Sequence, residues 1–572
     1  MDISNLTPDI FVENDTEFLQ QLQRNEVWES IPFLNYTDVQ NLQDKRLVKF
    51  QGMIQDMFNP EYFYEKYEVI DRDSEQTAIR NGKFTDIIYF KDTETINETS
   101  DKNVTNERHT LVMISIPGLN QWVIDMVKAR YGILKQIEPF QSSTSKKRLL
   151  EPDEQMETQP IESGKLEMKK QCVGEAKSNV KNISRETILN FPLPSHDGKA
   201  CHVKLYKDAD KVKLNDVIEV VGFLSVDPVL TDISCNENFG NEMEVQMHNP
   251  PPSLIPRIHC VAFKKISHGI PLVENNILNL DRIQNAKKNL HLVLTQLLMG
   301  DVLAAEYLMY HLISRVYMRN ELLSLGKFTL NISNVPVKYV PNFARNLSDF
   351  IELMVPTSHY VALSLENFNT VEFIPKKDYE CDRLTSGLLQ LSENTHLILD
   401  ETKLTTGRLT EKGLKAYNAL SDAIKFQKIT YDFNYYPVEF NCDIAFLVIS
   451  EKNATLPSDC HIALQPDNDS IETYSEILAA AKVFLKNDVL NDIRMYLSQS
   501  RYRNFELNDD VHKFIENEFV QMRKSQNITG DDLHQLLVLV RWIGLSEGKS
   551  KLDEDSWKRA RHIEEERKNR LS

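Results

Sequence analysis

The stretch 299–315, MGDVLAAEYLMYHLISR, decides the fold that we expect for the second half of the chain. An apolar run from His291 to Met299 leads into Gly300 and Asp301, and apolar residues at helical spacing follow. A strand, a glycine-containing turn and a helix in this order form the frame of a phosphate-binding P-loop. The sequence therefore predicts a nucleotide-site frame at Gly300 and Asp301.

The residues that would hold a nucleotide are missing from this frame. A phosphate cradle needs glycines whose backbone N–H groups converge, followed by a lysine and a serine or threonine. Glu306 and Tyr307 stand at those last two positions. A carboxylate repels a triphosphate, and the tyrosine ring crowds the magnesium position. The frame is therefore present without its catalyst, and we predict no catalytic residue, no cofactor and no metal site.

A second motif of the same kind lies about a hundred residues further on. The segment LILDE, 397–401, is an apolar run that ends in Asp400 and Glu401. In P-loop ATPases such acids hold magnesium and polarise the attacking water. Alone the motif is weak evidence, because many buried strands end in acids. The two motifs in this order favour an α/β domain of the P-loop type.

Length, charge and cysteine content exclude some classes of protein and favour others. The 572 residues suggest roughly two to four domains. The net charge of −18 disfavours a phosphate backbone as main partner, since such binding needs clustered cations, and it favours protein partners. Seven scattered cysteines without a CxxC pair argue against a zinc ribbon or a disulfide framework. With no signal peptide and no membrane-length apolar run, we expect a soluble, intracellular protein without a membrane partner.

The first half of the chain is rich in strand patterns, interrupted by one polar segment. Residues 137–187 are predicted to be a disordered linker, because they hold few residues able to form a core. Gly222 permits the bend that a small barrel needs. We expect an OB-like β-barrel in two parts, and any other small barrel or sandwich remains an alternative. The predicted strands are RLVKFQGMIQDMF (46–58), YEVI (67–70), TDIIYF (85–90), HTLVMISIPG (109–118), CHVKLYK (201–207) and DVIEVVGFLSV (216–226).

The second half alternates between helices and short apolar strands and ends in helices. Strands typical of a parallel sheet are LGKFTLNIS (325–333), YVALSLEN (360–367), THLILDETKL (395–404) and CDIAFLVISEK (442–452). The fold class predicted is an α+β multidomain protein. Its domains are an N-terminal segment 1–45, OB-like parts 46–136 and 188–270 around the linker, an AAA+-like α/β domain 271–471 and a C-terminal helical lid 472–572.

Many ordered stretches of this chain resemble the mini-chromosome maintenance (MCM) complex-binding protein family. They are VKFQGMIQDMFNPEYF (48–63), LNFPLP (189–194), LNDVIEVVGFLSVDPVL (214–230), IPRIH (255–259), GDVLAAEYLMYHLISRVY (300–317), LGKF (325–328), DRLTSGLLQL (382–391), LILDET (397–402) and ITGDDLHQLLVLVR (528–541). The segment before Trp28 looks shorter than this family's pattern. The resemblance implies a nuclear, non-enzymatic protein that associates with MCM helicase subunits and stands in for one of them. It also implies links to DNA replication, to MCM release from chromatin through indirect chromatin association, and to sister-chromatid cohesion.

The chain is more distantly similar to an MCM subunit itself, as a degenerate copy. GDVLAAEY resembles the MCM P-loop, and LILDE its Walker B strand. Asp531 stands where MCM subunits carry a lid arginine. LPSDCHIAL (456–464) occupies the arginine-finger region without an arginine, and Ser450 and Glu451 stand near the sensor asparagine. The resemblance implies a pseudo-ATPase that occupies a neighbour's face in the ring and adds no working site, so that the ring does not close stably.

A basic tripeptide, Lys146, Lys147 and Arg148, lies within the polar linker. Such tripeptides are commonly just solvated charge. In a chain that resembles a nuclear family, it is also a candidate nuclear import signal. Phosphorylation of the preceding Ser/Thr residues, 142–145, would weaken it.

Two other functions remain open from the sequence. An OB-type protein that binds single-stranded nucleic acid would use aromatic platforms and a basic groove, so direct nucleic-acid binding is an alternative. Aromatic residues are present at 62–64 and 67, but Glu61, Glu65 and Glu68 lie among them. An active ATPase is disfavoured because the P-loop lysine is missing.

Overall fold

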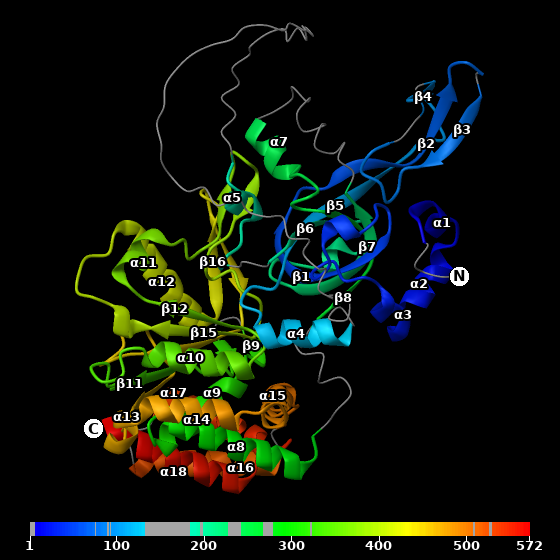
Figure 1. Ribbon diagram of the computed structural model, residues 1–572. Coiled ribbons are helices and arrows are strands. Elements are labelled where there is room, and N and C mark those ends of the chain that lie inside the picture. The colour runs from blue at the N-terminus through cyan, green and yellow to red at the C-terminus, as the bar shows by residue number, and fades with distance from the viewer. Residues whose placement is uncertain are drawn as a thin grey trace, which may run out of the picture.

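The computed structural model describes residues 6–74, 76–88, 91, 93–131, 183–194, 198–226, 242–266, 278–320, 323–506, 509–525 and 529–571. The chain forms a mixed α+β multidomain structure (Figure 1), with a β domain in its N-terminal half and helices at its C-terminal end. Within these residues, no helix is both long enough and apolar enough to cross a membrane.

Five strands of the N-terminal half close into a ring. The order is β1-β7-β8-β6-β5, and β5 pairs with β1 to complete it. Strands from both sides of the segment 132–182 thus pair in one sheet. All pairs in the ring are antiparallel except β6 with β8. The ring strands are β1 (Leu47–Met57), β5 (Val104–Ile114), β6 (Ala200–Leu205), β7 (Val217–Ser225) and β8 (Arg257–Lys265).

Gly222 lies where β7 and β8 approach most closely. The register between these strands shifts at Val221 and Gly222, as at a β-bulge. A Cβ atom at position 222 would lie 2.2 Å from the carbonyl oxygen of His259. The glycine is therefore required by a close backbone approach at the bend, as its place in the strand pattern predicts.

One predicted strand of this half is wrong. The described part of TDIIYF, residues 85–88, forms no strand. The chain turns at Phe84, whose φ is 64°, and the Phe84 side chain packs against Phe11 and Phe223. Burial of these side chains among the neighbouring elements overrides the apolar strand pattern.

A β-arm and three short helices accompany the barrel. The arm consists of β2 (Glu61–Asp71), β3 (Thr77–Asn81) and β4 (Glu94–Ile96), which extend from β5 and project from the barrel (Figure 1). Phe11, Phe18 and Trp28 of the N-terminal helices share a buried cluster with Val221 and Phe223 of β7. These helices are α1 (Pro8–Glu13), α2 (Asp15–Leu22) and α3 (Asn25–Ser30).

A five-stranded parallel sheet forms the centre of the second half. Its order is β12-β15-β18-β11-β19, and every neighbouring pair is parallel. The predicted parallel strands at 360–367, 395–404 and 442–452 are confirmed as strands of this sheet, although the observed strands are shorter. The strands are β11 (Leu330–Ser333), β12 (Ser358–Ala362), β15 (Thr395–Asp400), β18 (Ile444–Ile449) and β19 (Cys460–Ala463).

Helices cover both faces of this sheet. Leu397 and Leu399 of β15 pack in the core with α11 and α12, whereas Ile398 points into the opposite core. That second core also holds the C-terminal helices, so they share one hydrophobic interior with the sheet (Figure 1). The helices are α8 (Leu280–Leu297), α9 (Val302–Ile313), α10 (Phe343–Met354), α11 (Leu365–Thr370), α12 (Glu411–Phe426), α13 (Asn468–Glu472), α14 (Tyr474–Phe484), α15 (Asn487–Tyr502), α16 (Asp509–Ser525), α17 (Gly530–Ser546) and α18 (Glu554–Leu571).

Two small sheets and three short helices complete the described chain. The strands β13 (Lys376–Asp378), β14 (Arg383–Thr385), β16 (Lys428–Asp432) and β17 (Pro437–Asn441) form a four-stranded sheet beside α12. A hairpin joins β9 (Met318–Asn320) to β10 (Leu323–Leu325). The helices are α4 (Gln121–Arg130), α5 (Arg185–Leu189) and α7 (Glu242–His248). The predicted linker 137–187 lies outside the described residues except at its end, where α5 begins.

Buried side-chain hydrogen bonds join the barrel half to the α/β half. Asn120 donates to the Val355 carbonyl at 2.7 Å, and Asn215 donates to the Tyr431 hydroxyl at 2.7 Å. The backbone N–H of Leu384 donates to the Asp56 carboxylate, also at 2.7 Å. An unpaired buried polar group costs free energy, so each of these bonds favours one relative placement of the two halves.

Candidate functional site

The carboxyl-terminal edge of the parallel sheet is the first place to look for a site. In open α/β sheets, ligands bind in the crevice outside the carboxyl ends of the strands. Three segments meet at this edge: the loop 334–342 after β11, Asp400 and Glu401 after β15, and Ser450 after β18.

Asp400 is buried and both of its carboxylate oxygens are bonded to protein donors. Oδ1 accepts from the backbone N–H of Thr402 at 3.0 Å and from its hydroxyl at 2.6 Å. Oδ2 accepts from the Tyr360 hydroxyl at 2.6 Å. The carboxylate caps the short 3₁₀ helix Glu401–Lys403 and ties it to β12. Asp400 thus stabilises a turn, where a Walker B aspartate would hold magnesium.

Glu401 is used in the same way. Its Oε2 accepts from the N–H of Thr455 at 2.9 Å. Its Oε1 accepts from the Thr455 hydroxyl at 2.9 Å and from the N–H of Leu456 at 3.0 Å. The carboxylate therefore fixes the loop between β18 and β19.

The loop after β11 offers no phosphate cradle. Residues 334–342 contain no glycine, and Pro336 and Pro341 have no N–H to donate. The N–H groups of Val335, Val337 and Tyr339 donate to carbonyls of Ser450, Val335 and Pro336. Convergent free N–H groups are what a phosphate needs, and this loop directs its donors to its own chain and to the next strand.

The strand predicted before Gly300 is wrong. Residues 291–297 belong to helix α8, so Gly300 lies between two helices and not between a strand and a helix. The run His291–Met299 is apolar at helical spacing and faces the core, a pattern that short apolar segments do not distinguish from a strand. Gly300 adopts φ +87°, which lets the chain turn from α8 into α9.

Asp301 links three segments of the α/β half. Its Oδ1 accepts from the N–H of Ala304 at 3.0 Å and thereby caps α9. Its Oδ2 accepts from the N–H of Gln465, after β19, at 2.9 Å and from Arg570 of α18 at 2.7 Å. The side chain is buried, so this carboxylate is part of the scaffold.

Glu306 and Tyr307 also bind the C-terminal helix. Arg559 of α18 forms an ion pair with Glu306 at 2.5 Å. The Tyr307 hydroxyl donates to Glu564 at 2.9 Å, and burial raises the pKa of this tyrosine. At the positions where a P-loop would place Lys and Ser/Thr, this chain holds α9 against α18.

Asp531 is exposed at the start of α17. It lines a cavity of about 280 Å³ together with Tyr307, Lys327 and Arg567. The structure brings Asp531 to the same face as Tyr307, but not to the edge that carries Asp400 and Glu401. Lys146, Lys147 and Arg148 lie outside the described residues.

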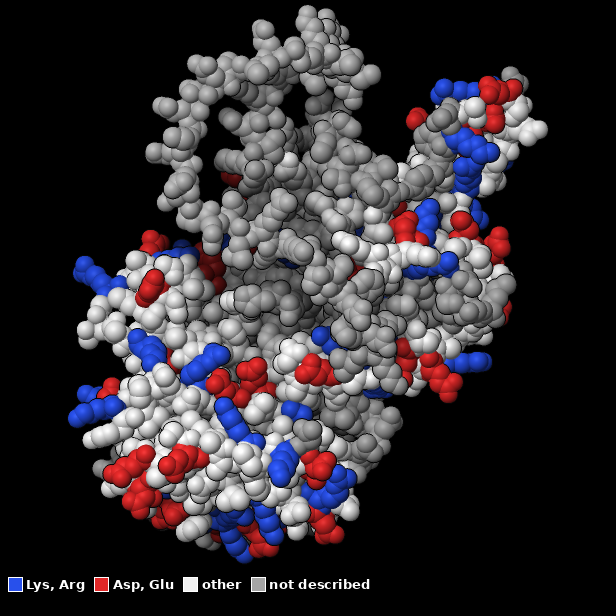
Figure 2. All heavy atoms as spheres, in the orientation of Figure 1, with Lys and Arg blue, Asp and Glu red and all other residues white. Residues whose placement is uncertain are grey.

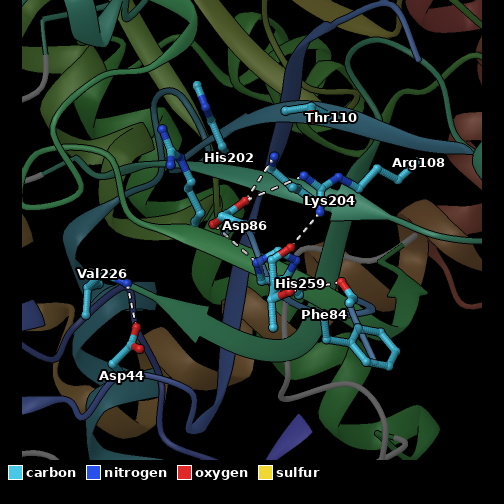
Figure 3. Close-up of polar contacts among 12 residues, drawn as sticks. Asp44, Phe84, Asp86, Arg108, Thr110, His202, Lys204, Val226 and His259 are labelled. Carbon is cyan, nitrogen blue, oxygen red and sulfur yellow. Dashed lines mark hydrogen bonds and ion pairs between the residues drawn. The ribbon is translucent and has the colours of Figure 1, made fainter. Parts of the chain in front are cut away.

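An ionic cluster buried at the barrel wall has no counterpart in the sequence-based site predictions. Asp86 lies 3.0 Å from Lys204 Nζ, 3.2 Å from His259 Nε2 and 3.9 Å from Arg108 (Figure 3). Lys204 and Arg108 also contact Glu61 of β2, at 2.8 and 3.1 Å. The signal in the sequence was a lone acid within the apolar run TDIIYF, a pattern that favours a buried, paired carboxylate over a strand residue.

The cluster fixes the charge state of its members. Burial acts to raise the pKa of Asp86, but the charges of His259 and Lys204 outweigh it and hold this pKa well below its usual value. Burial lowers the pKa of His259, whose Nδ1 lies 2.7 Å from the Tyr206 hydroxyl. The cluster joins the segment after β3, and β2 itself, to the barrel.

One group of side chains has the spacing of metal ligands within the described residues: Glu244, His248 and Asp382, whose ligand atoms lie within 4.8 Å of one another. His248 Nε2 donates to the Cys381 carbonyl at 2.9 Å, and Asp382 pairs with Lys377 at 2.8 Å. Two of the three side chains are thus already engaged by the protein.

Charges of both signs are interspersed on the molecular face shown in Figure 2. On the C-terminal helices, Arg561 pairs with Glu518 and Lys568 with Asp532, at 2.7 and 3.3 Å. Paired surface charges of this kind do not form the continuous basic stripe that a nucleic-acid backbone requires.

The fold and the carboxyl edge of its sheet define a multidomain α+β protein whose acidic edge residues are committed to its own loops. The family described as mini-chromosome maintenance replisome factor matches residues 18–571, and this chain belongs to that family. It is 38% identical to the mini-chromosome maintenance complex-binding protein of Gallus gallus, over 97% of this chain and 93% of the relative. The Homo sapiens protein of that name is 37% identical, over 97% and 93%, and the Drosophila melanogaster protein 37%, over 95% and 93%.

We expect Glu401→Gln to destabilise the fold by about 1–3 kcal/mol, because an amide presents hydrogens to the Thr455 and Leu456 donors. Thermal unfolding would measure the effect, with the exposed Glu411→Gln as the matched control. MgATP should not raise the unfolding temperature of the wild type. A rise with MgATP that Glu401→Gln abolishes would contradict the structural role.

Asp86→Asn should lower the free energy of unfolding at pH 7 by roughly 3 kcal/mol, since it leaves buried cations without their partner. The folded pKa of Asp86 lies below the unfolded value of about 3.9, so its contribution to stability is complete above about pH 5. The contribution is lost progressively as the pH falls through the unfolded pKa toward the folded pKa. Unfolding temperatures of wild type and variant should therefore converge below pH 5, and the exposed Asp101→Asn should show no such pattern. A difference that is constant from pH 7 to pH 3 would refute the assignment.

Proposed function

We propose that this chain binds the MCM complex as a non-catalytic partner. The observation that carries the proposal is its 37–38% identity, along nearly its whole length, to relatives named mini-chromosome maintenance complex-binding protein. From the same relationship we propose action in DNA replication, through an alternative complex that supplies subunits or promotes their release from chromatin. A link to sister-chromatid cohesion belongs to the same proposal.

The second part of the proposal is that the α/β half is an AAA+-like pseudo-ATPase. Support comes from the all-parallel sheet with acids at the carboxyl end of β15, separated by β18 from β11. In this arrangement the loop 334–342 after β11, and not Gly300, takes the place of the P-loop. This loop contains no glycine, and its Val335, Val337 and Tyr339 N–H groups donate to carbonyls of the chain. Asp400 and Glu401 accept hydrogen bonds from neighbouring segments.

A mechanism follows from ring geometry. Subunits of ATPase rings pack side by side with nucleotide between neighbours. A look-alike that contributes no phosphate contacts can occupy a neighbour's face while its interface lacks the nucleotide that stabilises ring closure. Subunit replacement and subunit release would then have one physical cause.

The β16–β17 hairpin is the exposed feature of the α/β half best suited to a partner. Tyr435 and Tyr436 at its tip are 83% and 57% exposed, and Tyr379 of the neighbouring turn packs beside Tyr435 with ring centroids 5.4 Å apart. Exposed aromatic side chains are enriched at the energetic centres of protein interfaces.

A single-strand-binding function is less well supported, although the closed five-stranded ring is consistent with an OB-type barrel. Lys204, Arg108 and Arg257 are 4–8% exposed, and the first two are paired with Asp86 and Glu61. Buried, paired cations do not offer the accessible basic groove that single strands require. Salt-dependent binding of single-stranded DNA would favour this alternative.

The purified chain should co-migrate with one or more MCM subunits in size-exclusion chromatography with mass determination, and displace another from a reconstituted assembly. The double variant Tyr435→Ser/Tyr436→Ser should weaken this association at least about tenfold, as loss of aromatic anchors does. Tyr62→Ser, on the β-arm and 73% exposed, is the matched control.

Different results would contradict MCM binding and subunit mimicry by the α/β half. A chain that migrates alone in every mixture would exclude MCM binding. Association that survives the tyrosine variants and a wider series over the α/β and helical surfaces would exclude subunit mimicry, because mimicry requires that this half carries the interface.

Nuclear location is also part of the proposal, with Lys146, Lys147 and Arg148 as the import signal. Replacing all three by alanine should reduce nuclear accumulation of a fluorescent fusion, because import signals depend on clustered positive charge. Replacing Lys165, Lys169 and Lys170 of the same segment is the control. Unchanged accumulation of the first variant would reject the signal.

A further inference from the structure

A cavity of about 300 Å³ lies between the barrel, the amino ends of β12 and β15, and helix α15. Barrel residues Asn215 and Val217 line one side, Thr357 and His396 the start of the sheet, and Ser498 and Arg501 the helix. This is the opposite edge of the sheet from Asp400 and Glu401, so the cavity is separate from the edge described above.

Three polar side chains in the cavity wall have buried atoms without a hydrogen-bond partner among the described residues. Arg501 is 5% exposed and donates from Nη1 to His396 Nε2 at 2.8 Å, yet its Nε and Nη2 meet no acceptor there. Because an arginine can only donate, His396 Nε2 must accept, and its Nδ1 carries the hydrogen. That Nδ1, and the hydroxyl of Ser498, are likewise buried without a partner among these residues. Buried donors are rarely left unsatisfied unless something is bound there.

The charges around the cavity favour an anion. Lys213, Lys265, Arg494 and Arg501 line it, against two carboxylates, Asp216 and Glu393. Asp216 is already paired with Lys265 at 2.7 Å. Burial raises the pKa of Glu393, and burial also raises that of nearby Asp443, which accepts from the Val316 N–H at 3.1 Å.

The rest of the wall is apolar. Leu312, Met354, Val355 and Leu497 face the cavity from the α/β half, and Ile116 and Leu119 from the barrel half. Ligand sites in proteins combine such walls with a few convergent polar groups that fix orientation. In this cavity the polar groups are the side chains of Arg501, His396 and Ser498, which lie close together in the wall.

We propose that this cavity binds a small organic oxyanion, a carboxylate or phosphate group carried on an apolar body. The oxyanion accepts from Arg501 Nε and Nη2, a bidentate geometry that suits both groups, and from His396 and Ser498. The apolar body contacts the leucine and methionine side chains. Because the wall comes from both halves of the chain, an occupant stabilises their relative placement. The proposal does not depend on MCM binding.

Octanoate is the first probe, since it carries one carboxylate on an apolar chain. In thermal unfolding of the full chain, millimolar octanoate should raise the unfolding temperature by about 2 °C or more, because a ligand that binds the folded state stabilises it. Octanol, which has the same tail without charge, should have no such effect. Inorganic phosphate tests the oxyanion without an apolar body and should act more weakly than octanoate.

Arg501→Met should weaken octanoate binding, measured by calorimetry, at least about tenfold, as loss of a charge-assisted pair does. Arg503→Met, two residues away and outside the cavity wall, is the matched control. A second variant covers the case in which Arg501→Met does not fold. Ser498→Asp places a carboxylate one helical turn from Arg501, so it should raise the unfolding temperature and abolish the octanoate effect.

Four results would overturn the proposal. The first three are no stabilisation of the wild type by octanoate, equal binding by wild type and Arg501→Met, and a lower unfolding temperature for Ser498→Asp. The fourth is stabilisation by phosphate alone, because the apolar body would then have no role.

Discussion

The buried carboxylate of Asp301 holds the α/β half together. It caps α9, receives the chain just after β19, and pairs with Arg570 near the end of α18. These three segments are far apart in the sequence, and without the carboxylate each would lose the acceptor that binds it to the other two. Because α8 and α9 come before the sheet and α18 ends the chain, this contact closes the helical layer on one face of the sheet.

Closure of that layer helps to fix the loops that bind the acidic residues at the carboxyl edge of the sheet. Asp400 and Glu401 each receive donors from segments that the two cores hold in place. A carboxylate whose two oxygens both accept hydrogen bonds from the protein stabilises the turn around it. These bonds make the carboxyl edge part of the rigid framework of the α/β half.

The sequence predicts an element correctly where its apolar pattern and its length both indicate the same type of secondary structure. β15 and β18 were identified because short, wholly apolar runs are typical of strands buried on both faces. The run His291–Met299 failed because a short apolar segment fits a core helix equally well, and only the contacts of α8 decide between them. TDIIYF failed because the environment of Asp86 depends on Lys204 and His259, which are distant in sequence. Arg501 could not be predicted as a site residue, since nothing local reveals that its guanidinium lacks acceptors.

The two edges of the parallel sheet differ in whether their buried polar side chains have hydrogen-bond partners. This difference bears on how the two halves of the chain are held together. At the carboxyl edge, every oxygen of Asp400 and Glu401 has a donor. At the amino edge, donors of Arg501 and His396 have no acceptor among the described residues, and the barrel lies directly against them. The relative placement of the two halves depends on contacts of the barrel with the amino edge and with the four-stranded sheet. Asn120 bonds to Val355 beside the amino end of β12, whereas Asn215 and Asp56 bond to Tyr431 of β16 and Leu384 of β14. An anion at Arg501 would add a further contact between the two halves.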